Sequence, residues 1–281
     1  MPITIQERKY LKNKHKGGKN NSKGSTYENY YATYLIALYT HKYMAEIESV
    51  FLSSQLEYAF VDDLLVNETN TLLRTYHQLK NVAQLTWKSG KSCSLESDFK
   101  RQMEISTEKG ETFKLKLIYS KVDSGVSAVP NNLSPFTTSE YFPACQSINQ
   151  LILSYPPFKD AIKQIMVQQE VPDDELSGAA SAILGAWNSV NQNNVSLQKI
   201  SDIVYSKGKG YVNIKTYPTV VVSDKCKKIL NQFGLTFREN GLKIYWFYGN
   251  LQGEVVWTDN TEQRLVDSNP TDIWNLIEVL S

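Results

Sequence analysis

The sequence predicts a mixed α/β fold in which helices flank a sheet, followed by a helical region and a small C-terminal α/β module. Residues 56–81 are rich in aromatic and β-branched side chains around a polar turn, a pattern typical of a β-hairpin. An apolar pattern with helical spacing precedes this hairpin, and a second helix and an alternating strand follow it. Helices and strands in this order favour a layered α/β core.

Two strands and a polar turn make up the expected hairpin. The first strand is expected at residues 57–66, the turn at residues 67–70 (Asn-Glu-Thr-Asn) and the second strand at residues 71–80. The first strand carries the acidic pair Asp62 and Asp63. An Asp-Asp pair at a strand end is commonly a solvated turn, so the pair alone indicates no chemistry.

The second strand supplies polar partners for this acidic pair. Side chains alternate along a strand, so Gln78 and Lys80 project together while Leu79 points to the other face. Folding at the turn brings Asp63 near Gln78 and Lys80. A lone Lys on a strand more often protects a sheet edge. A carboxylate, an amide carbonyl and an ammonium on one face, however, are suited to holding a divalent cation against a phosphodiester.

A helix is expected before the hairpin, at residues 26–43, with Ser25 or Thr26 as its N-cap. Glu28 falls in the first turn of this helix, where the helix dipole favours a carboxylate. That favourable placement explains Glu28 without any catalytic role.

The elements after the hairpin complete the expected core domain, which spans residues 26–125. Ser94 is placed to cap a helix at residues 95–107, and residues 113–121 (FKLKLIYSK) alternate as a strand does. A strand, a hairpin, a helix and a further strand are compatible with one mixed α/β layer.

The N-terminal segment, residues 1–25, holds seven Lys and Arg residues against the single acid Glu7, with Gly and Asn interspersed. This composition predicts a basic mobile arm. Two roles suit such an arm: it contacts nucleic-acid phosphates, or it is a solvated tail that improves solubility.

Residues 122–142 are rich in Pro, Ser and Asn, and we expect a domain boundary there. A helical region follows at residues 143–206, with helices at 145–155, 157–169, 174–190 and 196–205. Residues 211–281 are expected to form the small α/β module, with a helix at 225–233, a hairpin at 242–248 and 254–258, and a helix at 272–280. Three aromatic residues near this hairpin suit either a core or a docking surface: Trp246, Tyr248 and Trp257.

Global properties exclude several classes of protein. The formal net charge of +1 argues against a free-standing, strongly basic nucleic-acid binder. The 3 Cys residues lie far apart and make neither a disulfide framework nor a zinc site, and the 3 His residues lack zinc-hydrolase spacing. No apolar run reaches membrane-spanning length and no signal peptide is evident, so a cytoplasmic location without membrane association is expected.

The pattern Asp63…Gln78-x-Lys80 resembles the PD-(D/E)xK nuclease superfamily, in the Mrr-like branch where Gln replaces the second acid. A narrower resemblance, over residues 18–125, is to the Cap-type nuclease domain of bacterial antiphage effectors, which occurs in CBASS and Lamassu-type systems. It rests on three segments: Gly24-Ser25-Thr26-Tyr27-Glu28, the Asp62-Asp63 strand, and Tyr76-His77-Gln78-Leu79-Lys80-Asn81. The resemblance implies a restriction-endonuclease-like sheet.

The resemblance also implies a metal-dependent endonuclease that acts on double-stranded DNA with Mg²⁺, or with Mn²⁺ in its place. Asp63 would bind the metal directly, and Asp62 is the alternative ligand if the register differs by one residue. The Gln78 carbonyl oxygen would take the position of the second acid, and the carbonyl of Leu79 could add a further oxygen. The number of metal ions stays open, because Gln is a neutral ligand.

Further roles and partners follow from the same resemblance. Lys80 would stabilise charge on the phosphate in the transition state, and Glu28 would orient a water of the metal. A Lamassu-like arrangement implies an SMC-like ATPase, a small accessory subunit and self-association on activation. The alternative is a non-catalytic subunit that retains the nuclease fold and serves in assembly or DNA binding.

Overall fold

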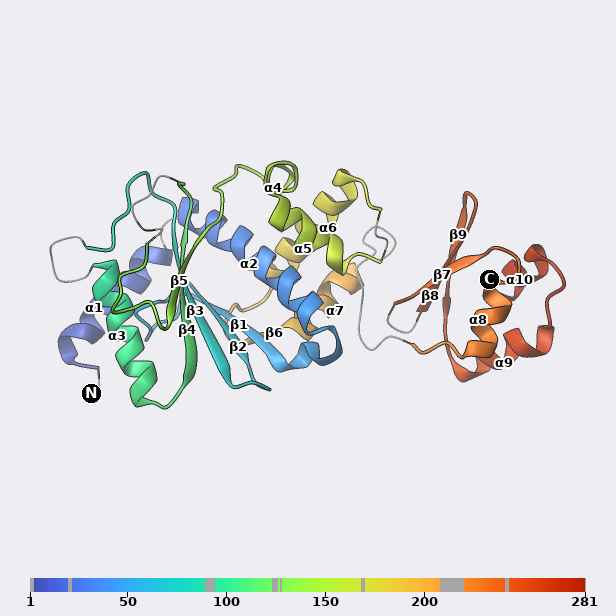
Figure 1. Ribbon diagram of the computed structural model, residues 1–281, viewed down its shortest axis with the longest axis horizontal. Coiled ribbons are helices and arrows are strands. Elements are labelled where there is room, and N and C mark those ends of the chain that lie inside the picture. The colour runs from blue at the N-terminus through green and yellow to red at the C-terminus, as the bar shows by residue number, and fades with distance from the viewer. Residues whose placement is uncertain are drawn as a thin grey trace. The chain divides into compact units, whose positions relative to one another are not determined.

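The chain divides into two structural units, and a mixed β-sheet organises the first. The first unit comprises residues 1–165 and 170–212, and the second comprises residues 166–169 and 213–281. The second unit is close in extent to the module expected at residues 211–281. The computed structural model in Figure 1 describes residues 3–19, 22–88, 94–122, 126, 128–167, 170–207, 220–240 and 243–280.

Six strands form the sheet of the first unit, in the order β5-β4-β3-β2-β1-β6. The strands β1, β2 and β3 pair antiparallel, whereas β4 and β5 run parallel to β3 (Figure 1). Their bounds are Val50–Ser54 (β1), Leu64–Glu68 (β2), Leu73–Lys80 (β3), Thr112–Tyr119 (β4), Thr137–Tyr141 (β5) and Val195–Ser196 (β6). The mixed α/β class predicted from the sequence, with a mixed sheet flanked by helices, is therefore confirmed.

One face of the sheet packs against α3 (Leu95–Glu108), the crossover helix that a parallel β3–β4 connection requires. Alternate residues of β4 point into this layer, where Leu115 and Leu117 are fully buried beside Phe99 of α3. Ser94 caps α3 by accepting a hydrogen bond from the backbone N–H of Ser97, as the sequence predicted. The start of the crossover helix α3 therefore lies close to the end of β3.

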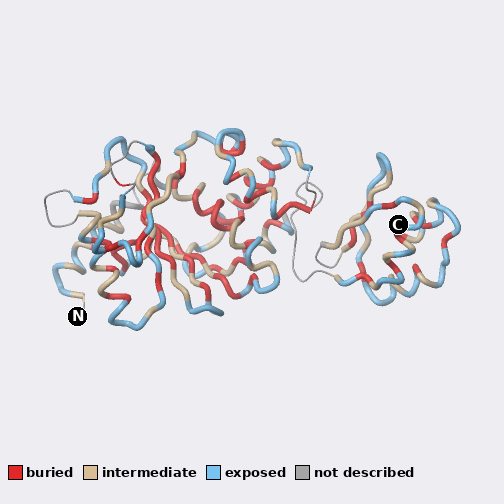
Figure 2. The backbone as a smooth tube through the Cα atoms, in the orientation of Figure 1, coloured by how far each residue is buried: buried red, intermediate tan, exposed pale blue. Residues whose placement is uncertain are grey.

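The other helices of the first unit lie mainly on the opposite face (Figure 1). They are α2 (Ser22–Lys42), α4 (Ile148–Ser154), α5 (Pro156–Ile165), α6 (Asp173–Ser189) and α7 (Leu197–Lys207). Aromatic rings join these helices to the sheet: Tyr31 of α2 lies edge-on to His77 of β3, and Phe158 of α5 contacts Tyr34. Figure 2 shows the resulting buried layer on this side. None of the helices in the described ranges has the length and apolar character that crossing a bilayer requires.

The N-terminal segment differs from the mobile arm expected at residues 1–25. Residues from Ile5 to Lys19 form helix α1, and Leu11 on this helix is buried against Phe60 and Ile105. Arg101 of α3 also pairs with Glu7 of α1, with Nε 2.6 Å from Oε1. The expectation of a mobile arm is therefore wrong for this helix, because its apolar residues and Glu7 tie it to α3.

The hairpin also differs from its expected boundaries. Only residues 64–66 of the strand expected at residues 57–66 are extended, as the start of β2, and the turn lies at residues 69–72 instead of 67–70. Residues 55–63 form a loop between β2 and β1, a strand that the sequence did not predict. Backbone hydrogen bonds close the base of this loop, from Gln55 to the Asp63 carbonyl at 3.0 Å and from Leu56 to the Asp62 carbonyl at 2.8 Å.

The domain boundary expected at residues 122–142 is wrong as well. The strand β5 lies in this segment and pairs with β4, so the segment completes the sheet instead of ending it. The helical region expected as a separate part, residues 143–206, belongs to the same unit as the sheet. Its helices bury the outer face of α2 and cannot form an independent layer.

The second unit contains a three-stranded antiparallel sheet with three helices in its described part. The elements are α8 (Asp224–Asn231), β7 (Thr236–Asn240), β8 (Lys243–Tyr248), β9 (Leu251–Val256), α9 (Asp259–Ser268), α10 (Ile273–Leu280). The sequence predicted α8, the β8–β9 hairpin and α10 but not β7 or α9. Trp246 and Trp257 are buried in the core of this unit, so of the two roles expected for them they have the core role.

Because the helical region and the sheet form one unit, a core mutation in α5 should destabilise strands far from it in sequence. We expect Phe158→Ala to lower the free energy of opening of the β3 amides by about 3–5 kcal/mol, since it removes a fully buried ring. Native-state hydrogen exchange measures this effect. Leu153→Ala, at a side chain 64% exposed on α4, is the control and should change it by less than about 0.5 kcal/mol. Equal effects of both variants would contradict a single cooperative unit.

Candidate active site at the ends of β2 and β3

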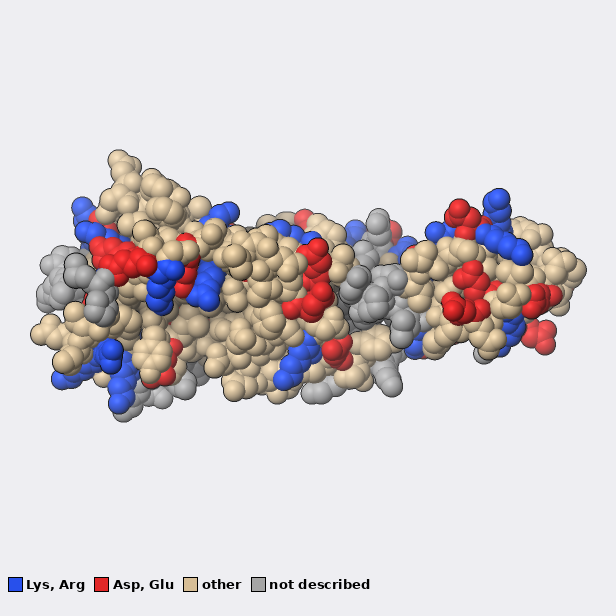
Figure 3. Space-filling view, turned by 90° about the horizontal axis from the view of Figure 1, so that it is seen from below, with Lys and Arg blue, Asp and Glu red and all other residues tan. Residues whose placement is uncertain are grey.

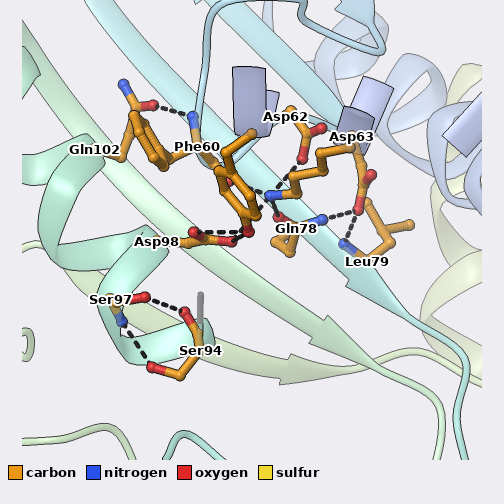
Figure 4. A network of polar contacts seen from close by, with 11 residues as sticks. Phe60, Asp62, Asp63, Gln78, Leu79, Ser94, Ser97, Asp98 and Gln102 are labelled. Carbon is orange, nitrogen blue, oxygen red and sulfur yellow. Dashed lines mark hydrogen bonds and ion pairs between the residues drawn. The ribbon is translucent and has the colours of Figure 1, made fainter. Parts of the chain in front are cut away.

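The ends of β2 and β3 bring Asp63 and Gln78 into direct contact (Figure 4). Leu64 lies opposite His77 in the antiparallel ladder, so the next residues outward face one another across the strand ends. Asp63 Oδ2 accepts hydrogen bonds from Gln78 Nε2 and from the backbone N–H of Leu79, the latter at 2.6 Å. The proximity of Asp63 to Gln78 that alternation predicted is confirmed. Leu79, however, presents its N–H to Asp63, not its carbonyl.

A second contact at this site comes from α1, where the ammonium of Lys14 lies among four oxygen atoms. Lys14 donates to the Phe60 carbonyl and, at 3.0 Å, to Gln78 Oε1. It also forms ion pairs with Asp62 Oδ1 at 3.0 Å and with Asp98 Oδ2 at 3.1 Å. Asp62 and Asp63 therefore have different partners, although they are adjacent in the sequence.

Glu28 and Lys80 border the same cluster of charges. Because α2 begins at Ser22 and not after a cap at Ser25 or Thr26, Glu28 lies beyond the first turn of this helix, the turn in which it was expected. Glu28 accepts a hydrogen bond of 2.7 Å from Gln55 Nε2. Burial and the nearby Asp63 charge raise the pKa of Glu28 to about 7, against the opposing effects of Gln55 and Lys80. Lys80 is half-buried and forms no ion pair with any residue in the described part of the chain. Its charge acts on Glu28 through space.

The electrostatics of the Asp62–Lys14 pair follow from burial. Burial raises the pKa of Asp62 to about 6, although the Lys14 charge opposes this shift. Burial lowers the pKa of Lys14, but the carboxylates of Asp62 and Asp98 outweigh it, so the net pKa lies above the ordinary value. Lys14 is therefore fully protonated at neutral pH, and its charge compensates the buried carboxylates.

A cleft of about 920 Å³ has Glu28 and Gln55 in its wall. Its lining does not include Asp62, Asp63, Gln78 or Lys80, so it adjoins the charged cluster through Glu28. Amide side chains from the end of α6 and from the loop between α6 and β6 form another part of the wall: Asn188 on α6, and Asn191, Gln192 and Asn193 in the loop. This loop is fixed to the sheet because the backbone N–H of Ser54 bonds to the Gln192 carbonyl at 2.8 Å. The helical region thus contributes to the cleft next to Glu28, which the sequence did not indicate.

The sequence located some residues of this cluster and missed others. Gln78 and Lys80 lie near the end of β3 as expected, whereas Asp62 and Asp63 lie in the loop just before β2 and not on a strand. Glu28 is close enough to Asp63 and Lys80 for their charges to shift its pKa. Missed residues are Lys14, Gln55, Phe60, Asp98 and Gln102, whose Oε1 accepts from the Phe60 N–H at 2.9 Å. One signal was available for Lys14: Tyr10, Leu11 and Lys14 share the i, i+3/i+4 spacing of one helix face.

The donor set at this site fits a divalent cation. The described residues contain no group of three or more His, Cys, Asp or Glu arranged to hold a metal ion. Yet the Lys14 ammonium is a cation surrounded by carboxylate, amide and backbone carbonyl oxygens, which are the ligand types that Mg²⁺ prefers. Asp63 Oδ1 accepts no hydrogen bond from the residues that the structure describes, and it is available as a further ligand.

Comparisons of the chain with protein-family models, with curated proteins and with solved structures give no match. The family therefore stays a resemblance carried by Asp63, Gln78 and Lys80, and the functional argument depends on the geometry of the site.

The raised pKa of Glu28 makes stability depend on pH. Its unfolded value is 4.5 and its folded value is about 7, so between these values the folded protein holds a proton that the unfolded chain has released. Stability therefore falls as pH rises through this window. Glu28→Gln keeps an oxygen for Gln55 but cannot ionise, so it should gain roughly 1–3 kcal/mol relative to the unmutated chain between pH 5 and pH 8.

Urea unfolding in EDTA at the two pH values measures this difference. Glu57→Gln is the matched control, because Glu57 lines the same cleft but is exposed. A Glu28→Gln variant whose stability follows the unmutated chain at both pH values would show that Glu28 ionises normally in the folded state.

Proposed function

We propose that the chain is a metal-dependent DNA endonuclease with a restriction-endonuclease-like fold. The observation that carries this proposal is the contact of Asp63 at the start of β2 with Gln78 near the end of β3, with Lys80 two residues further along β3. The order α2–β1–β2–β3–α3–β4, with β4 parallel to β3, supports it because it is compatible with the mixed core of restriction-like nucleases.

The residues of the site suit phosphodiester hydrolysis. Asp63, with oxygens of Asp62 and Gln78, would hold Mg²⁺ or Mn²⁺, which supplies positive charge to the scissile phosphate. Lys80 adds a second positive charge where the phosphate becomes more negative in the transition state. Glu28, with a pKa of about 7, can take up a proton from an attacking water near neutral pH.

The charge distribution supports a partner or self-assembly for DNA binding. The net charge is +1, and on the face drawn in Figure 3 the described Lys and Arg residues are interspersed with Asp and Glu in each unit. A duplex carries about one negative charge per 1.7 Å, so tight binding needs more positive charge than a net charge of +1 supplies. We include in the proposal an antiphage defence complex with an SMC-like ATPase and a small accessory subunit, in which the second unit serves as a docking module.

Cleavage of supercoiled plasmid with Mg²⁺ or Mn²⁺ tests the proposal. Lys80→Ala should lower the rate about 10²–10³-fold, because it removes a charge that acts on the transition state. Lys114→Ala, which removes an exposed lysine from β4, should cleave at the rate of the unmutated chain. Cleavage by Lys80→Ala at an unchanged rate would exclude this site, and an inert chain in the presence of both metals and its partner subunits would favour a non-catalytic subunit.

A further inference from the structure

The oxygens around the Lys14 ammonium form a binding site for a cation, and the Lys14 side chain of the same protein occupies this site. Asp62 and Asp98 supply carboxylate oxygens at 3.0 and 3.1 Å, and Gln78 and Phe60 supply carbonyl oxygens. The Asp62 and Asp98 side chains are 5% and 9% exposed, so they are built to face a positive charge and not solvent. Two of these oxygens, on Asp62 and Gln78, are also the ligands proposed for the metal.

An ammonium and a divalent cation cannot share these oxygens. Both need the Asp62 carboxylate and the Gln78 carbonyl, and two positive charges within hydrogen-bonding distance of the same atoms repel strongly in a buried site. Occupancy by Lys14 therefore excludes the metal, and entry of the metal requires Lys14 to leave.

The helix that carries Lys14 has a small contact surface. Leu11 is the one buried side chain among the described residues of α1, and it packs against Phe60 and Ile105. The half-buried ring of Tyr10 also stacks on Phe60, with the ring centroids 6.1 Å apart. Among the polar contacts, the Tyr10 hydroxyl donates to Asp98, and Glu7 pairs with Arg101 at 2.6 Å. An element with few buried apolar contacts opens at lower cost than the core does.

We propose that helix α1 competes with the metal ion for this site. The site is inactive while α1 places Lys14 in it, and it becomes active when α1 withdraws. This inference rests on the proposed nuclease function for its biological role, but the competition between Lys14 and a divalent cation is a property of binding alone. The site is then closed by the chain's own N-terminal helix until a metal ion, DNA or a partner subunit displaces it.

Binding of Mn²⁺ alone to the full chain, measured by isothermal titration calorimetry, tests the competition. Lys14→Met should bind Mn²⁺ at least about tenfold more tightly, because the competent state no longer has to be selected from a minor population. Lys12→Met removes an exposed lysine from the same helix and should bind within about twofold of the unmutated chain.

A second pair of variants separates displacement of the helix from a simple change of charge, and it applies even if Lys14→Met fails to fold. Glu7→Ala breaks the pair that ties α1 to α3, so it should tighten Mn²⁺ binding roughly threefold or more. Glu104→Ala removes the other carboxylate that pairs with Arg101, but Glu104 lies on α3 itself and does not hold α1. Both variants remove one negative charge, and this loss by itself weakens Mn²⁺ binding. Tighter Mn²⁺ binding by Glu7→Ala but not by Glu104→Ala therefore reports the release of α1 and not the change of charge.

Hydrogen exchange of the α1 amides in the unmutated chain gives an independent readout. Saturating Mn²⁺ should increase their exchange rate and leave that of β3 unchanged. Unchanged α1 protection, Mn²⁺ affinities equal in all four variants, or no Mn²⁺ binding by any of them would overturn the competition. Tighter Mn²⁺ binding by Lys14→Met and Glu7→Ala, without plasmid cleavage in the presence of the partner subunits, would leave the competition standing and refute the nuclease. Plasmid cleavage that depends on Lys80, with Mn²⁺ affinity unchanged in Lys14→Met and Glu7→Ala, would support the nuclease and overturn the competition.

Discussion

Compensation of buried negative charge is the constraint on which this site depends. Asp62, Asp63 and Asp98 are all buried near the ends of β2 and β3, where uncompensated carboxylates would cost several kcal/mol each. The chain meets this constraint in two ways. Asp63 accepts N–H groups from Gln78 and Leu79, whereas Asp62 and Asp98 share one ammonium. The first solution is fixed by the sheet, and the second depends on a helix that is far from the strands in sequence.

The sheet explains why these groups meet. The central strand β3 has an antiparallel neighbour on one side and a parallel neighbour on the other, so the start of β2 and the end of β3 lie at the same edge. The crossover through α3 then brings Asp98 to that edge. The loop between α6 and β6 adds amide side chains through its hydrogen bond to Ser54. Elements from both halves of the first unit therefore form the charged cluster and the cleft that adjoins it at Glu28.

Local patterns predicted the parts of this site that depend on neighbouring strands. Alternation along residues 71–80 was sufficient to place Gln78 and Lys80 on one face, and hairpin pairing placed Asp63 beside them. The loop at residues 55–63 was missed because its aromatic and aliphatic residues resemble those of a strand. Ala59, Phe60 and Val61 pack into the core from this loop, whereas Tyr58 is exposed. The strand β5 was missed because Pro, Ser and Asn surround it. Lys14 was missed because its partners lie 46 to 84 residues away, and the composition of residues 1–25 indicates a solvated segment. The shared spacing of Tyr10, Leu11 and Lys14 indicates only a common helix face.

Gln55, the first residue of the loop after β1, is subject to two conflicting structural constraints. Its backbone has a φ of 51°, in the left-handed region that costs a side-chain-bearing residue roughly 1–2 kcal/mol and glycine almost nothing. Its amide is also the donor to Glu28. A glycine would relax the chain here but leave that carboxylate without its donor, and the acid would hold its proton to still higher pH. Backbone strain at Gln55 thus accompanies a hydrogen bond that limits the rise in the pKa of Glu28, a residue 27 positions away in the sequence.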